Sequence, residues 1–188
     1  MKEFIQKNRL FSFYTSLMLI IVFIAIFAPW LAPGDAFTSN MSQALQAPSS
    51  QHWFGTDKLG RDVMSRIIYG TQLSLFMGVS IVVIMVTIGT VIGAVAGYFG
   101  GKVEMVLMRL ADIMLSFPGV VLAIAIAGIL GGSIVNTILA LSVVGWAKYA
   151  RLVRSMTLKV RGEEYVTAAV MMGASTSTIL RRHIIPNI

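Results

Sequence analysis

The sequence contains no cysteine and only two histidines, His52 and His183, among its 188 residues. A disulfide framework, a thiol nucleophile and a Cys/His metal site therefore cannot be built from this chain alone. Charged residues are also scarce, at 12% of the sequence, whereas 56% of the residues are hydrophobic and the mean hydropathy is +0.81. A soluble domain of this composition could not cover its apolar surface, so we expect the chain in a lipid bilayer.

The motifs of several function classes are missing as well. The sequence has no GxSxG or HExxH motif, no TVGYG filter and no carboxylate in the middle of an apolar run. The stretch AGYFGGKV is not a phosphate loop, because Ala96 replaces the first glycine of GxxxxGK[ST] and Val103 replaces the hydroxyl residue that would hold magnesium. We expect no catalytic residue, metal ligand or cofactor, and Gly100 and Gly101 instead predict a tight turn.

The net charge of +7 does not indicate nucleic-acid binding. The basic residues gather at the ends of apolar runs and form no stripe with interleaved aromatic residues. This distribution is typical of a membrane protein, in which lipid is a partner and nucleic acid is not.

Four stretches approach the roughly 20 apolar residues that a membrane-spanning helix needs. They predict an all-α, polytopic membrane protein with spans at Ser12–Leu31, Leu73–Tyr98, Val106–Leu130 and Ile134–Tyr149. The fourth stretch becomes long enough to span the bilayer if the side chains of Lys148 and Arg151 extend to the membrane–water interface.

Basic residues predict the orientation of these spans. Lys2, Lys7 and Arg9 precede the first span against one acid, Glu3, and residues 148–182 carry seven basic residues against two acids. Both ends are therefore expected in the cytoplasm, with the loop 32–72 outside. The first span could instead be a cleaved signal peptide. This alternative is disfavoured, because the apolar run is longer than that of a signal peptide and no convincing cleavage site follows it.

Small residues and a proline predict how the helices pack. Gly89, Gly93 and Gly97 are spaced by four, so they share one face to which a neighbouring helix can come close, although glycine is common in membrane helices. Pro118 predicts a kink in the third span. In the same span, Arg109 and Asp112 are spaced to pair on the helix surface.

The segment EEYVTAAVMMG, residues 163–173, predicts a short helix after the last span. Glu163 and Glu164 suit its positive end, and Gly173 can end it in a left-handed conformation. Tyr165, Ala169 and Met172 are spaced to share a face, and Ala168 keeps the adjacent surface flat. Docking to another protein is favoured over lying on lipid, because the helix begins with acids. Ser175 or Thr176 can cap a second helix, ILRRHII, that leads to Pro186.

In the loop 32–72, Asp57 is expected to cap an interfacial helix. Gly55 and Gly60 permit turns there, and Arg61 and Asp62 complete the candidate loop site. The apolar face of that helix would consist of Val63, Met64, Ile67 and Ile68.

Residues 164–187, EYVTAAVMMGASTSTILRRHIIPN, resemble the EAA loop of the membrane subunits of bacterial ABC importers. The spacings Ala169 to Gly173 and Gly173 to Pro186 match that motif. HWFGTDKLGRDVMSRIIYGTQLSL, RLADIMLSFPGVVLAIAIAGILG and WAKYARLVRS are similar to the dipeptide, oligopeptide and nickel branch. The sequence departs from the motif at Thr167, which replaces its glutamate, and at His183 and Ile185.

The resemblance implies a permease subunit that imports peptides, with nickel or a metal chelate as alternative cargo and a pore or scaffold without an ATPase as the rival class. Its partners would be a second permease in a heterodimer, two cytoplasmic ATP-binding subunits and an extracytoplasmic substrate-binding protein.

The fold implied is part of a six-span domain, from which the chain is expected to be truncated. The expected organisation is 1–31 for the cytoplasmic terminus and first span, 32–72 for the outer loop and 73–188 for the transport domain, with 163–186 as a coupling loop that an ATPase moves.

Overall fold

The computed structural model describes residues 9–188, which form helices joined by loops. Across this range the only β-type pairing is an isolated bridge between Thr56 and Asp62, so the predicted all-α class is confirmed. The chain divides into two compact units at Gly78, inside a helix, and each unit is described by itself. The predicted boundaries at residues 31 and 72 stay predictions.

The first unit contains the first predicted span. This stretch forms α2 (Arg9–Ile26), which has 18 residues and is apolar enough to cross a membrane, followed by the short α3 (Ala28–Leu31). A loop with one 3₁₀ turn, η1 (Met41–Gln43), then leads to α4 (Val63–Phe99).

Helix α4 is longer than the sequence predicts. It has 37 residues, or about 55 Å at 1.5 Å per residue, and it is also apolar enough to cross a membrane. The predicted separate interfacial helix is wrong, because Val63, Met64, Ile67 and Ile68 form the first turns of α4 itself. The charge of Arg66 shortens the apolar run that a sequence window detects, but it does not interrupt the helix.

The third predicted span is broken. Helix α5 (Gly101–Ser116) and helix α6 (Gly119–Leu130) meet at a bend of 91°. The expected kink at Pro118 is therefore confirmed, but a continuous span over 106–130 is wrong. Proline disfavours helical backbone in the residue before it, and Phe117 is extended, with φ −93° and ψ 148°.

The fourth predicted span lies within α7 (Ile134–Arg161). Ser133 caps the start of this helix, because its hydroxyl accepts a hydrogen bond from the Asn136 amide at 3.1 Å. Among the described residues, length and composition qualify two helices as spans, or three if α5 and α6 count as one broken span. The polytopic membrane fold is thus shown, and α7 as a fourth span stays a prediction.

Gly100 and Gly101, both with positive φ, form the predicted turn between α4 and α5.

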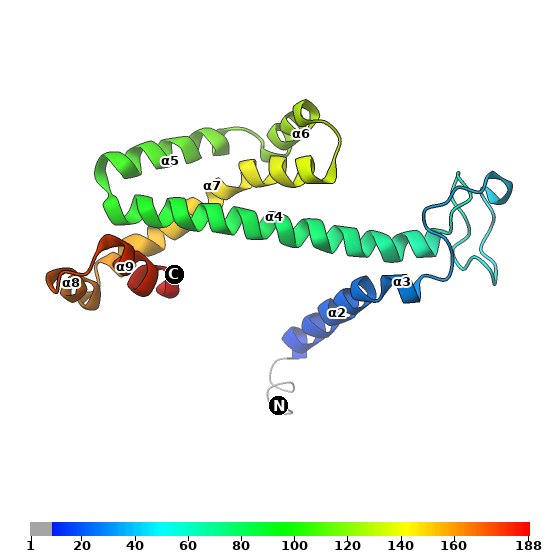
Figure 1. Cartoon of the computed structure of the whole chain (residues 1–188), viewed down its shortest axis with the longest axis horizontal. Coiled ribbons are helices and arrows are strands. Elements are labelled where there is room, and N and C mark those ends of the chain that lie inside the picture. The colour runs from blue at the N-terminus through cyan, green and yellow to red at the C-terminus, as the bar shows by residue number, and fades with distance from the viewer. Residues whose placement is uncertain (1–8) are drawn as a thin grey trace. The chain divides into compact units, whose positions relative to one another are not determined.

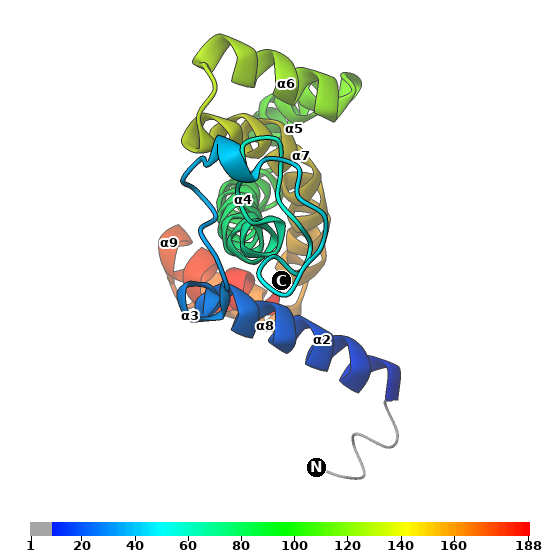
Figure 2. The ribbon, with the colours of Figure 1, turned by 90° about the vertical axis from the view of Figure 1, so that its right-hand side faces the viewer.

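Helices α4 and α7 lie side by side in the second unit (Figures 1 and 2). The contact runs along the three glycines of α4. A Cβ atom added to Gly89 would lie 2.5 Å from Tyr149 Cβ, one added to Gly93 would lie 2.5 Å from the Ala150 carbonyl oxygen, and one added to Gly97 would lie 2.7 Å from Thr157 Cβ. All three distances are too short for a real side chain, so the two backbones approach as closely as they do because these positions lack one.

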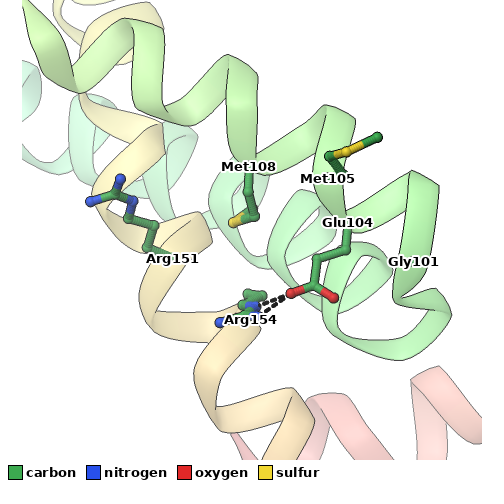
Figure 3. Close-up of a pocket in the computed structure, with 6 residues that line it drawn as sticks. All are labelled: Gly101, Glu104, Met105, Met108, Arg151 and Arg154. Atoms are coloured by element: carbon green, nitrogen blue, oxygen red, sulfur yellow. Dashed lines mark hydrogen bonds and ion pairs between the residues drawn. The ribbon is translucent and has the colours of Figure 1, made fainter.

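Two ion pairs join α5 to α7 in the same unit. Arg154 donates from Nε to Glu104 Oε1 at 2.6 Å, and Arg151 pairs with Asp112. Figure 3 shows Glu104 and Arg154 directed toward each other beside a pocket lined by methionines. The predicted pairing of Arg109 with Asp112 is therefore wrong, because the carboxylate of Asp112 pairs with a residue of the neighbouring helix instead.

We expect Gly93→Ala to lower the free energy of unfolding by about 1–3 kcal/mol, the usual cost of overpacking, because its Cβ would meet the backbone of α7. The matched control is Gly78→Ala, in the same helix but with no atom within 4 Å of the added Cβ, which should stabilise by up to about 1 kcal/mol. Thermal unfolding of the detergent-solubilised protein measures both. Equal effects of the two substitutions would contradict close packing at Gly93.

Candidate coupling site

The segment after α7 begins with a short helix, α8 (Glu164–Met171). Glu163 is its N-cap residue but makes no side-chain capping bond, and Glu164 lies in the first turn. The two carboxylates therefore act on the positive end of the helix through their charge.

The end of α8 is fixed by Gly173. Its φ is +80°, its amide donates to the Val170 carbonyl at 3.0 Å, and the Ala174 amide donates to the Ala169 carbonyl at 3.1 Å. This pair of hydrogen bonds is a Schellman motif, which needs a left-handed residue at the position of Gly173. No atom lies within 4 Å of a Cβ added there, so the backbone conformation is what favours glycine.

A second arm runs back from this turn. Ser175 caps α9 (Thr176–Ile179) by accepting a hydrogen bond from the Thr178 amide at 3.3 Å. The helix then widens into a π turn, η2 (Leu180–Ile184), and tightens into a 3₁₀ turn, η3 (Ile185–Asn187), which contains Pro186. Pro186 has no backbone N–H to donate, so an α-helix would lose a hydrogen bond at this position.

The two arms are held together by a small apolar cluster. Its buried members are Val166, Ile179 and Ile184, and they pack against Tyr98 of α4 and Val160 of α7. The hairpin of α8 and α9 is thus attached to the ends of the two helices that meet along the glycine face.

The exposed surface of α8 differs from the face that the sequence predicts. Ala169 is only 3% exposed and lies with Val166 on the buried side, so it does not share an outward face with Tyr165 and Met172. The reason is the second arm, which covers that side of α8. We define the outer face of α8 by the exposed residues of its later part and its C-cap, Thr167, Ala168, Val170, Met171 and Met172.

This outer face is unusually apolar for an exposed surface. Met171 is 82% exposed and Met172 is 81% exposed. The sequence prediction did not include Val170 and Met171. The three-residue spacing of Val166 and Ala169 could have indicated the buried side of the helix, and the exposed side lies opposite to it. Methionine is adaptable in shape and is frequent at surfaces that bind other proteins.

Tyr165 and Thr167 contact the backbone of the same segment. The Tyr165 hydroxyl donates to the His183 carbonyl at 3.4 Å, and the two rings lie 6.2 Å apart. The hydroxyl of Thr167 donates to the Glu163 carbonyl at 3.4 Å, within its own helix.

In the loop of the first unit, Asp57 has a different role from the one predicted. It does not cap a helix; its carboxylate accepts hydrogen bonds from the Leu59 amide at 2.8 Å and the Arg61 amide at 3.0 Å, and it pairs with Arg61 and Arg66. Burial raises the pKa of this carboxyl, but the hydrogen bonds from Arg61, Leu59 and Arg66 outweigh it and lower the pKa. Asp57 therefore organises the turn before α4.

The cap of α4 is Asp62, which is 2% exposed. Its Oδ2 accepts from the Ser65 amide at 2.7 Å, and its Oδ1 lies 3.0 Å from His52 Nδ1. Burial raises the pKa of Asp62, whereas the hydrogen bonds from Ser65 and His52 lower it, and the net direction is down. Asp57 and Asp62 are only five positions apart, and only the folded loop decides which of the two carboxylates reaches the first turn of α4.

Gly55 and Gly60 permit the turns of this loop, as predicted for their residue type. Their φ angles are +71° and +74°, and a Cβ on Gly55 would lie 2.3 Å from the Gln46 carbonyl oxygen. The backbone of the loop therefore folds too tightly at Gly55 for any side chain.

Comparison with known proteins identifies relatives of the chain. Residues 89–188 match the family described as binding-protein-dependent transport system inner membrane component, and residues 5–48 match the N-terminal TM domain of oligopeptide transport permease C. The chain is 42% identical over 183 residues to the dipeptide transport system permease protein DppC of Alkalihalophilus pseudofirmus, covering 97% of this chain and 60% of that relative.

Two further relatives have related names. The oligopeptide transport system permease protein OppC of Bacillus subtilis is 37% identical over 182 residues, which cover 97% of this chain and 60% of the relative. The glutathione transport system permease protein GsiD of Pectobacterium atrosepticum is 41% identical over 170 residues, which cover 90% of this chain and 56% of the relative. The chain thus spans about 60% of the length of the first two relatives.

We expect Asp62→Ala to raise the rate of amide hydrogen exchange at Ser65 and to destabilise the start of α4 by about 1 kcal/mol, the usual cost of replacing a helix cap by alanine. Because the pKa of Asp62 is lowered by folding, its contribution is present above the unfolded pKa near 4 and is lost as the pH falls through the lower folded pKa. Exchange at Ser65, corrected for the intrinsic rate, should therefore accelerate below about pH 4 in the natural protein and depend less on pH in the variant.

The control is Asp35→Ala, because Asp35 accepts hydrogen bonds from the Phe37 and Thr38 amides in an exposed turn. Exchange at Ser65 should not change in this variant. Unchanged exchange in Asp62→Ala would contradict the capping role.

Proposed function

Because the chain belongs to the family of binding-protein-dependent transport system inner membrane components, we propose that it is the permease subunit of an ATP-driven ABC importer that moves peptides across the cytoplasmic membrane. Three observations support peptides as the cargo: the permeases similar to this chain are named for dipeptide, oligopeptide and glutathione transport. Nickel or a metal chelate is the alternative cargo for the same class of transporter.

The observation that carries the proposal is the hairpin of α8 and α9. Its outer face exposes Val170, Met171 and Met172, whereas its inner face packs against α4 and α7. A segment built in this way can bind a separate protein on one side and pass its displacement to two helices on the other. We propose that the bound protein is a cytoplasmic ATPase, and that closure of two ATPase subunits moves the spans between inward-open and outward-open states.

The proposal places the chain in an assembly. A second permease would form the other half of the pathway, two ATP-binding subunits would hydrolyse ATP, and an extracytoplasmic protein would deliver the substrate. This chain would carry no catalytic residue. The excess of basic residues in 148–182 supports a cytoplasmic position for the hairpin, and with α7 as the fourth span the N-terminus would lie in the cytoplasm as well.

The assembly is tested by purification in mild detergent after expression with the neighbouring genes. We expect an ATP-binding subunit to elute with this chain, and reconstituted vesicles to take up a radiolabelled dipeptide only when ATP is present. A pore or scaffold without an ATPase would elute alone and would pass solute without ATP. That result would overturn the proposal.

Gly173→Val should lower both dipeptide uptake and the stimulation of ATP hydrolysis while the chain still inserts into the membrane. A β-branched residue at φ +80° costs about 1–2 kcal/mol or more, so the turn that orients α8 would be lost. Gly162→Val is the matched control, because Gly162 lies at the other end of the segment with φ −78°. Normal uptake by Gly173→Val would count against coupling through this turn.

The outer face of α8 can be tested separately. Met171→Glu together with Met172→Glu places two charges on the exposed apolar surface and should reduce the amount of ATPase that elutes with the chain by about tenfold or more, because buried charges without partners are costly. Thr167→Glu is the control, since it adds a single carboxylate to the same face at the position where the EAA motif has glutamate. Equal loss in both would show that any charge there disrupts binding.

A further inference from the structure

The basic residues of α7 differ in their partners. Lys148, Arg151 and Arg154 follow one another at three-residue steps along the helix. Arg154 pairs with Glu104 and Arg151 with Asp112, both on α5. Among residues 9–188, no carboxylate lies within ion-pair distance of Lys148. The series therefore has three cations and two anions.

The surroundings of Lys148 explain why its charge is uncompensated. As α5 continues past Asp112, the residues that reach the level of Lys148 are Met114, Leu115 and Phe117, which bear no charge. They line a hollow of about 520 Å³ together with Lys148. Its volume is in the range of roughly 300–1,000 Å³ that is typical of sites for small ligands.

The hollow is formed where transport proteins often bind their cargo. It includes the break between α5 and α6, because Phe117 and Gly119 line it on either side of Pro118. Met85 of α4 and Val144 of α7 close its other sides. Discontinuous helices at membrane depth are tolerated where they line a cavity, and they commonly carry the substrate site.

The depth of Lys148 follows from the packing of α7 on α4. Gly89 faces Tyr149, Gly93 faces Val153 and Gly97 faces Thr157, so the two helices run parallel in a fixed register. In this register Lys148 lies level with Ile88, about 16 Å along the helix axis from the end of α4 at Phe99. Lys148 is consequently the cation of α7 that lies farthest from this end, and a charge that enters a membrane without a partner is costly unless a ligand or water satisfies it.

We propose that Lys148 binds the carboxylate of the translocated substrate, the terminal carboxylate in the case of a peptide, inside this hollow. This inference rests on the proposed function and deepens it. The ammonium group supplies the charge, and the methionine and aromatic side chains around it offer an adaptable apolar wall for side chains of varied shape. A carboxylate of another subunit has the same chemistry as the substrate's, and the experiment must separate the two.

The absence of cysteine from the chain allows a direct test. Phe117→Cys places its only thiol in the hollow, at a position that is 55% exposed. The assembled complex, in detergent, is treated with a fluorescent maleimide, and labelling of this chain is read from its band on a gel. The probes are the dipeptide Ala-Phe and the same dipeptide with a C-terminal amide, which lacks the carboxylate.

We expect Ala-Phe to slow labelling, and the amide to need a concentration at least about tenfold higher for the same protection. In Phe117→Cys with Lys148→Gln this difference should disappear, and with Lys148→Arg it should persist. Arg109→Gln is the control for loss of a basic residue, because Arg109 is exposed on α5 and does not line the hollow. It should leave the tenfold difference unchanged.

Three results would overturn the inference: equal protection by the two probes, no protection by either, or an unchanged difference in Lys148→Gln. If Lys148 instead pairs with a carboxylate of another subunit, Lys148→Gln should weaken the assembly on gel filtration and neither probe should alter labelling. Two measurements separate failure of this inference from failure of the proposed function. If the complex takes up dipeptide with ATP but Lys148 does not distinguish the two probes, only the role of Lys148 is refuted. If the chain elutes without an ATPase, the proposed function itself is refuted.

Discussion

The close contact between α4 and α7 is the constraint on which the second unit depends. Lipid tails are as apolar as the helix surfaces, so the hydrophobic effect does not hold two membrane helices together, and direct packing must do so. Gly89, Gly93 and Gly97 allow that packing by letting one backbone lie against the other. The same register sets the depth of the charges on α7 and brings Tyr98 and Val160 together beneath the α8–α9 hairpin. The hairpin therefore packs against the ends of both helices.

The break at Pro118 gives the rest of the unit a different kind of attachment. Helix α5 is joined to α7 by ion pairs from Glu104 and Asp112, and α6 leaves it at 91°. An ion pair depends on the charged ends of two side chains, whereas the glycine contact depends on the absence of side chains. The unit thus contains two kinds of contact with α7: a backbone contact from α4 and charged side-chain contacts from α5.

Features that depend on local backbone chemistry could be predicted from the sequence. Pro118 indicates the break, Gly100 and Gly101 indicate the turn after α4, and the apolar runs indicate an all-α membrane fold. The errors concern partners that lie far away in the sequence. Asp112 is spaced to pair with Arg109, but it pairs with a residue of α7; Ala169 is spaced to face outward, but the second arm covers it. No pattern within one helix contains this information.

Helix α7 shows how the same limit affects the count of spans. Length and composition do not qualify α7 as a span, and its sequence carries basic residues that lower its hydropathy. Arg151 and Arg154, however, are paired with carboxylates of α5, and a paired charge costs far less than an isolated one. The same carboxylates make α5 less apolar than a typical span. The charges of the two helices therefore compensate each other in part, and neither sequence segment shows this by itself.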